Sequence, residues 1–171
     1  MGCDIHAFIE HDFGNTNDNK IKNYKRTFAK LYLSRDYYLF SILANVRRSI
    51  ISIDNSAPIP PKGIPDNLSF HVIDEYTLCI VDDNDMKQEE EGYCSKSNAE
   101  RWMSNSYSKK YDENRVTHPD WHSVSWMTIK EVKRVQDSYI HLYKKKNTDL
   151  EAVLGIMKVL KNPRFIFWFD N

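Results

Sequence analysis

Apolar and polar residues alternate through the start of the chain, M-G-C-D-I-H-A-F-I-E. Successive side chains of a strand point to opposite faces, so this pattern predicts a half-buried strand. Its apolar face would consist of Cys3, Ile5, Ala7 and Ile9. Its other face would carry two carboxylates, an imidazole and an aromatic ring, namely Asp4, His6, Phe8 and Glu10.

Other segments also have the composition of strands. Residues 27–33 are a second candidate, and residues 70–82 are predicted to form one or two strands, with T-L-C-I-V the most β-like piece. The C-terminal stretch R-F-I-F-W-F is apolar on both faces, which is typical of a buried strand.

Helical spacing of apolar residues follows the second strand candidate. This helix would begin at a cap on Ser34 or Asp36 and end soon after Arg47. A short helix is expected within residues 97–108. Capping-box patterns precede two further apolar stripes, at Thr128-x-x-Glu131 and Thr148-x-x-Glu151.

Proline and charge mark the connecting segments. Residues 54–67 contain four prolines and a glycine, including Gly63 and Pro65, which excludes a helix and a central strand. So long a rigid loop is more often functional than accidental. Residues 82–92 are expected to form a solvated acidic loop, because they lack the spacing of a calcium-binding loop.

Strands at both ends of the chain, with helices between them, predict one α+β domain over residues 1–171. Its mixed sheet would include the N-terminal and C-terminal strands, and three or four helices would accompany it. The chain of 171 residues is long enough to bury a sizeable core.

Composition excludes several function classes. Lys and Arg number 24 and so do Asp and Glu, so no overall field draws the chain to duplex nucleic acid or to an anionic membrane. Three widely spaced cysteines without a C-x-x-C pair favour reduced thiols over a disulfide framework or a zinc ribbon. No apolar run is long enough to span a bilayer.

The Asp4-x-His6 pair has three interpretations: a metal or catalytic pair, a ligand-contacting edge, or the wet side of a strand. In metallophosphoesterases a D-x-H pair binds metal, but the G-D, G-N-H and G-H-x-H motifs of that family are absent from this chain. His122 or His118 would have to complete a metal site, and their spacing does not establish that they lie nearby.

A second candidate lies at H-S-V-S-W-M-T, where His122, Ser123 and Ser125 precede a predicted helix start. Free N–H groups at a helix N-terminus, together with an imidazole and hydroxyls, could bind an anion. The alternative is that Ser125 or Thr128 caps the helix while the neighbouring tryptophans pack in the core.

Two arginines frame the first predicted helix. The guanidinium fork matches phosphate oxygens, so Arg35 and Arg47 could together hold a phosphorylated ligand. The alternative is that both are solvated surface residues.

Four motifs together resemble a family of small bacteriophage-encoded proteins of uncharacterised role. The motifs are M-G-C-D-I-H, R-D-Y-Y-L-F-S-I-L-A-N-V-R, G-I-P-D-N-L-S and H-S-V-S-W-M-T-I-K-E. This chain has Lys62 where the family pattern has Arg, and Asn67 where it has Asp. The resemblance implies action in the cytoplasm of an infected bacterium, where small phage proteins often counter host defence.

The resulting hypothesis is that the protein binds and sequesters a phosphorylated, nucleotide-like immune signal without a cofactor or a metal, and could do so as a homo-oligomer. The expected ligand-binding residues are Asp4, His6, Arg35, Arg47, Gly63, Pro65, His122, Ser123 and Ser125. One alternative is a metal-dependent phosphoesterase or nuclease that uses Asp4, His6 and His122. The other is an inhibitor that binds a host protein through its loops.

Overall fold

The computed structural model describes residues 3–12, 25–47, 58–86 and 91–170. Within these residues the chain has an α+β architecture with five helices and two sheets. It divides into two compact units, Met1–Ser69 with His122–Asn171, and Phe70–Trp121. The α+β prediction is therefore confirmed, and each unit has its own sheet.

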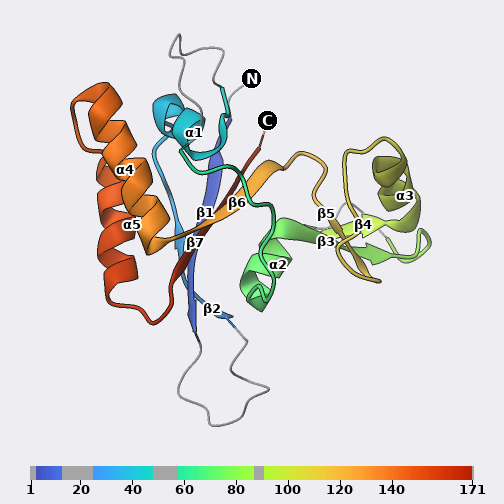
Figure 1. Cartoon of the computed structure of the whole chain (residues 1–171). Helices are drawn as coiled ribbons and strands as arrows, with labels where there is room; N and C mark the ends of the chain where they lie inside the picture. Colours follow the sequence, from blue (N-terminus) through green and yellow to red (C-terminus); the bar gives the residue numbers. More distant parts are fainter. Residues whose placement is uncertain (1–2, 13–24, 48–57, 87–90, 171) are drawn as a thin grey trace. The chain divides into compact units, whose positions relative to one another are not determined.

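The first unit contains a sheet of four strands in the order β2-β1-β7-β6 (Figure 1). The strands are β1 (Ile5–Asp12), β2 (Lys25–Leu31), β6 (His122–Thr128) and β7 (Arg164–Phe169). The N-terminal and C-terminal strands are neighbours, as predicted. All its pairings are antiparallel, so the expectation of a mixed sheet is wrong for this sheet.

Three helices pack on one face of this sheet (Figure 1). They are α1 (Tyr37–Ala44), α4 (Ile129–Tyr143) and α5 (Thr148–Lys158). The predicted apolar face of β1 is confirmed, because Cys3, Ile5, Ala7 and Ile9 all belong to the core beneath these helices. All six residues of β7 are buried, which confirms the C-terminal strand as a central element.

Helix caps match the sequence patterns in two of three cases. Thr128 and Glu131 form the predicted capping box of α4, and Asp36 caps α1. At α5 the prediction is wrong, because Asn147 caps the helix and Thr148 is its first residue. Asn147 is buried, and its Nδ2 donates to Asp36 Oδ2, so tertiary contacts select it over Thr148.

Helix α1 ends at Ala44, earlier than predicted. Asn45 adopts the left-handed conformation there, and its N–H donates to the carbonyl of Ser41. Asn tolerates this conformation better than most residues, so it provides a C-terminal cap.

The second unit contains a mixed sheet of three strands in the order β4-β3-β5. Its elements are α2 (Phe70–Tyr76), β3 (Thr77–Val81), β4 (Tyr93–Ser95), α3 (Lys96–Ser104) and β5 (Arg115–Thr117). The strand prediction for residues 70–82 is confirmed at β3 and wrong at α2. Val72 and Tyr76, which are buried, stand at helical spacing. This helix raises the number in the described chain above the three or four predicted.

A buried ion pair connects β1, β7 and the end of the proline-rich segment. Glu10 is fully buried, and its Oε2 accepts from Arg164 Nε at 2.6 Å. Arg164 also donates to the carbonyls of Asp66 and Asn67, at 2.8 and 2.7 Å. The other Glu10 oxygen accepts the Ser69 N–H at 2.7 Å. Glu10 therefore does not lie on a solvent-exposed face. Its charge is balanced inside the protein by Arg164.

Replacing Glu10 with Ala should leave the Arg164 charge buried without a carboxylate. Breaking a buried pair in this way costs about 3–5 kcal/mol of unfolding free energy, which urea denaturation followed by circular dichroism would measure. The matched control is Glu151→Ala, because Glu151 pairs with Lys146 at 2.8 Å on the surface. The control should cost less than about 1 kcal/mol, and equal losses in the two variants would contradict the assignment.

Candidate functional site

Several of the predicted site residues lie at one end of the four-stranded sheet, whereas Gly63, Pro65 and Ser125 do not. At this end β1 and β6 begin and β7 ends, since Ile5 and His122 are both in register with Phe169. Strands that flank a common neighbour lie about 10 Å apart. We call the polar residues at this end the sheet-end cluster: Asp4, His6, Arg35, Arg47, His122, Ser123 and Asp170.

Asp4 and Arg35 form a bidentate ion pair. Arg35 Nε donates to Asp4 Oδ1 at 2.7 Å, and Nη2 donates to Oδ2 at 2.5 Å. Hydrogen bonding to Asp4 and the charge of that carboxylate raise the pKa of Arg35 above its usual value. Half of the Arg35 side chain is exposed, and two of its five N–H donors are used by Asp4. The remaining donors have no acceptor among the described residues.

Asp170 completes the opposite side of the cluster. Its Oδ1 accepts the Asp4 N–H at 2.7 Å, and its Oδ2 lies 3.2 Å from His6 Nε2. The His6 ring also stacks on Trp168, with 5.7 Å between ring centroids. Sequence analysis missed Asp170. Only the pairing of β1 with β7 places it beside Asp4.

Cys3 lies next to Arg47 at this end of the sheet. Burial raises the pKa of the Cys3 thiol, and the charge and hydrogen bonding of Arg47 oppose the shift without reversing it. Cys3 is therefore a protonated core residue. Arg47 adopts a left-handed conformation with φ 57°, which is strained for a residue with a side chain.

His122, Ser123 and Ser125 lie in β6, which leads directly into α4 at Ile129, so the helix start predicted after them is confirmed. Thr128 caps that helix, and the anion site expected beside it stays a prediction. A register shift between His122 and Ser125 makes a bulge, and Ser123 there has φ 54°. Bulges redirect side chains and are frequent beside active sites.

The side chains at the bulge have different hydrogen-bond partners. His122 Nδ1 lies 2.9 Å from Ser123 Oγ, and His122 Nε2 has no hydrogen-bond partner in the described parts of the chain. Ser125 is fully buried, and its Oγ accepts the Lys62 N–H at 3.0 Å. Ser125 therefore positions the proline-rich segment, whereas His122 has a ring nitrogen available for a ligand.

The proline-rich segment is anchored beside β6 through Lys62. Its Nζ donates to Glu131 Oε2 at 2.8 Å and lies 3.5 Å from the centre of the Trp126 ring. Gly63 follows with φ 74°, a conformation that glycine adopts without strain, and Pro65 is buried. Residues 58–67 contain no helix or strand, as predicted, and residues 54–57 lie outside the described residues.

Lys62 also makes the α4 cap sensitive to pH. Burial would raise the pKa of Glu131, but hydrogen bonds from Lys62 and Thr128 outweigh it and hold that pKa below the usual 4.5. A carboxyl whose folded pKa is depressed stabilises the protein above its unfolded pKa, and this contribution is lost as the pH falls through the folded value.

Acidification from about pH 5 to about pH 3 should therefore lower the free energy of unfolding, as measured by urea denaturation at each pH. Glu131→Gln removes the titrating group and should show a shallower decrease. Glu100→Gln, an exposed change on α3, is the control and should follow the wild type. Identical pH slopes for Glu131→Gln and the wild type would contradict this role of Glu131.

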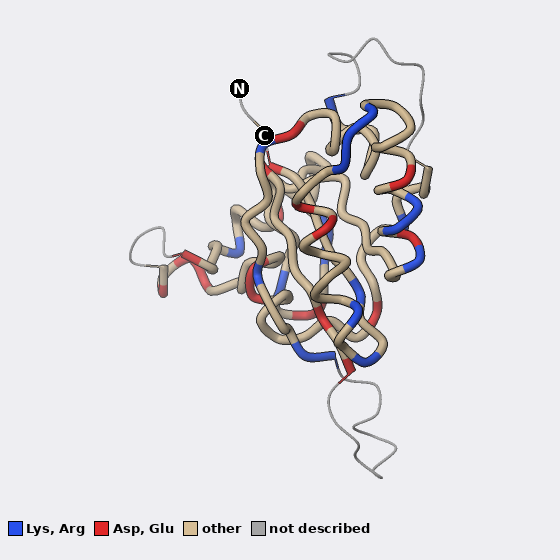
Figure 2. Tube along the Cα trace, turned by 90° about the vertical axis from the view of Figure 1, so that its left-hand side faces the viewer, with Lys and Arg blue, Asp and Glu red and all other residues tan. Residues whose placement is uncertain are grey.

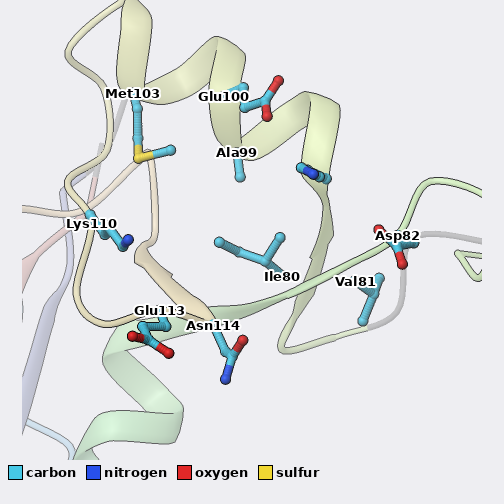
Figure 3. Close-up of a pocket in the computed structure, with 10 residues that line it drawn as sticks. Ile80, Val81, Asp82, Ala99, Glu100, Met103, Lys110, Glu113 and Asn114 are labelled. Atoms are coloured by element: carbon cyan, nitrogen blue, oxygen red, sulfur yellow. The ribbon is translucent and has the colours of Figure 1, made fainter.

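The second unit contains a separate hollow of about 370 Å³ between β3, α3 and the turn before β5 (Figure 3). Ile80, Ala99 and Met103 line it with apolar surface. Its charged lining residues are Asp82, Lys96, Glu100, Lys110 and Glu113. The predicted site residues do not line this hollow, and its opposite charges nearly cancel.

The metal alternative gains no support from the geometry. Within residues 3–12, 25–47, 58–86 and 91–170, no three His, Cys, Asp or Glu side chains converge to hold a metal ion. None of the helices in the same ranges is long and apolar enough to cross a membrane. Comparisons with protein-family models, with curated proteins and with solved structures found no match. The bacteriophage resemblance accordingly stays a prediction.

Proposed function

We propose that the protein binds and sequesters a phosphorylated, nucleotide-like small molecule at the sheet-end cluster. The proposal rests mainly on the orientation and exposure of the Arg35 guanidinium. Asp4 holds its guanidinium in one orientation, while half of the side chain and three of its N–H donors stay accessible. A planar donor fixed in this way is well suited to phosphate oxygens, because little side-chain entropy is lost on binding.

Two other donors lie at the same end of the sheet as Arg35. His122 has its Nε2 available, and Arg47 brings a second guanidinium to the same end of the sheet. The left-handed conformations of Arg47 and Ser123 add support, because strained backbone is concentrated at functional sites.

Two of the candidate nucleophiles, Cys3 and Ser125, are poorly placed for cleavage, which favours sequestration. The thiol of Cys3 is buried and has a raised pKa, and the hydroxyl of Ser125 is buried in a hydrogen bond to the Lys62 N–H. The bacteriophage resemblance supplies the setting, in which removal of a nucleotide-derived immune signal would counter bacterial defence.

The decisive experiment incubates the purified protein with a panel of cyclic and linear immune nucleotides, removes the unbound material and heats the protein. We expect one member of the panel to be released intact, as identified by chromatography and mass spectrometry. Release of a cleaved product would show that the protein cleaves the nucleotide, and sequestration would then be rejected as its function. Failure to retain any member would reject the proposal.

Arg35→Ala and His122→Ala should each weaken binding of the retained nucleotide about tenfold to a hundredfold, because each removes a hydrogen bond to a charged group. Arg35→Lys should fall between Arg35→Ala and the wild type, since it keeps the charge and loses the planar fork. Calorimetric titration gives the affinities, and melting curves show whether each variant is folded.

Arg101→Ala is the matched control, because Arg101 is an exposed arginine that donates to Asn98 on α3. It should bind as the wild type does. Folded Arg35 and His122 variants with unchanged affinity would reject the sheet-end cluster as the binding site.

A further inference from the structure

The outer surface of the α4–α5 pair contains a groove that is separate from the sheet-end cluster. The groove has a volume of about 370 Å³. Its floor consists of Ile129, Ile140 and Leu154, which are partly exposed. Figure 2 faces these helices and shows lysine and arginine positions along them. Single exposed apolar side chains are normal on a surface, so what distinguishes this place is that Ile129, Ile140 and Leu154 line one groove together.

Positive charges outnumber negative charges around the floor of the groove. Lys133 pairs with Asp137 at 2.9 Å, and Lys146 pairs with Glu151 at 2.8 Å. Both carboxylates of the rim are thereby neutralised. Lys130 and Lys158 also line the groove and are exposed.

These two lysines have no ion-pair partner among the residues that the structure describes. The groove therefore has a net charge of +2 from its four lysines and two carboxylates, in a chain whose formal charge is zero. An anionic partner with an apolar side complements this arrangement.

The length of the groove distinguishes a small anion from a helix as its partner. Along α4 the lining residues run from Ile129 to Ile140, which at 1.5 Å per residue is about 16 Å. This distance corresponds to about three turns of helix. A small anion would contact one end of such a groove, whereas an amphipathic helix would cover it throughout.

We propose that the α4–α5 groove is a docking surface for an acidic amphipathic helix of a partner protein. The apolar residues of that helix would pack on Ile129, Ile140 and Leu154 at the spacing of successive turns. Its carboxylates would pair with Lys130 and Lys158. This surface is distinct from the nucleotide site, so a protein that sequesters a ligand could also engage a protein.

The test measures fluorescence anisotropy of a labelled fourteen-residue peptide, designed with leucines on one helical face and glutamates beside them. We expect the full-length protein to bind it. The double variant Lys130→Glu/Lys158→Glu should weaken binding by at least about tenfold, because it reverses both complementary charges. The control Lys109→Glu/Lys110→Glu makes the same change of charge on the second unit and should bind as the wild type does.

Two comparison peptides test the chemistry of the partner. A peptide with lysines in place of the glutamates, and one with serines in place of the leucines, should both fail to bind. Equal binding of either peptide would overturn the proposal, as would equal weakening by the control variant. A further outcome is that decanoate binds the groove and the acidic peptide does not. The occupant would then be a small anionic amphiphile and not a helix, and the proposal would be overturned. Melting curves must show that both double variants are folded.

Discussion

The buried ion pair between Glu10 and Arg164 is the constraint on which the arrangement of the first unit depends. A buried charge is tolerated when its hydrogen-bonding capacity is satisfied inside the protein. Glu10 and Arg164 meet this requirement only when β1 and β7 are in register and the end of the proline-rich segment supplies two carbonyls and one N–H. The pair therefore sets the register of two central strands and the path of the segment that passes over them.

The proline-rich segment and the candidate site lie on the same sheet, towards its two opposite ends. From its anchor on Arg164, the segment continues back along β6, where Ser125 and Trp126 hold Lys62. The sheet-end cluster lies at the far ends of the same strands, with Asp4 and Asp170 placed together by the β1–β7 register. Two carboxylates there orient one guanidinium and one imidazole. Donors that are oriented before a ligand arrives lose less entropy when they bind it.

The equal numbers of acidic and basic residues conceal local differences of charge. At the sheet end, Arg35 pairs with Asp4 and His6 pairs with Asp170, so donors are available without a strong field. On α4 and α5 both carboxylates are neutralised and two lysines remain. A net charge of zero excludes long-range attraction to polyanions, but it does not exclude sites that recognise a particular anion at short range.

Local periodicity determined much of the fold. The alternation in β1 predicted its core face, and R-F-I-F-W-F predicted a buried strand, because one face or both had to be removed from water. The capping box at Thr128 could also be predicted from the sequence, because its two residues lie within one helical turn. Candidate site residues such as Asp4, Arg35 and His122 were selected for their chemistry, and the fold brings these three to one end of the sheet.

Tertiary structure decided the features that depend on distant partners. Glu10 belongs by pattern to a polar face, and only Arg164, far along the chain, makes its burial tolerable. Asn147 replaced Thr148 as a cap because Asp36 binds its side chain. Residues 70–76 have the composition of a strand and form a helix in the folded unit. Asp170 joined the site because β7 ends opposite β1, a pairing that the sequence does not encode within either strand.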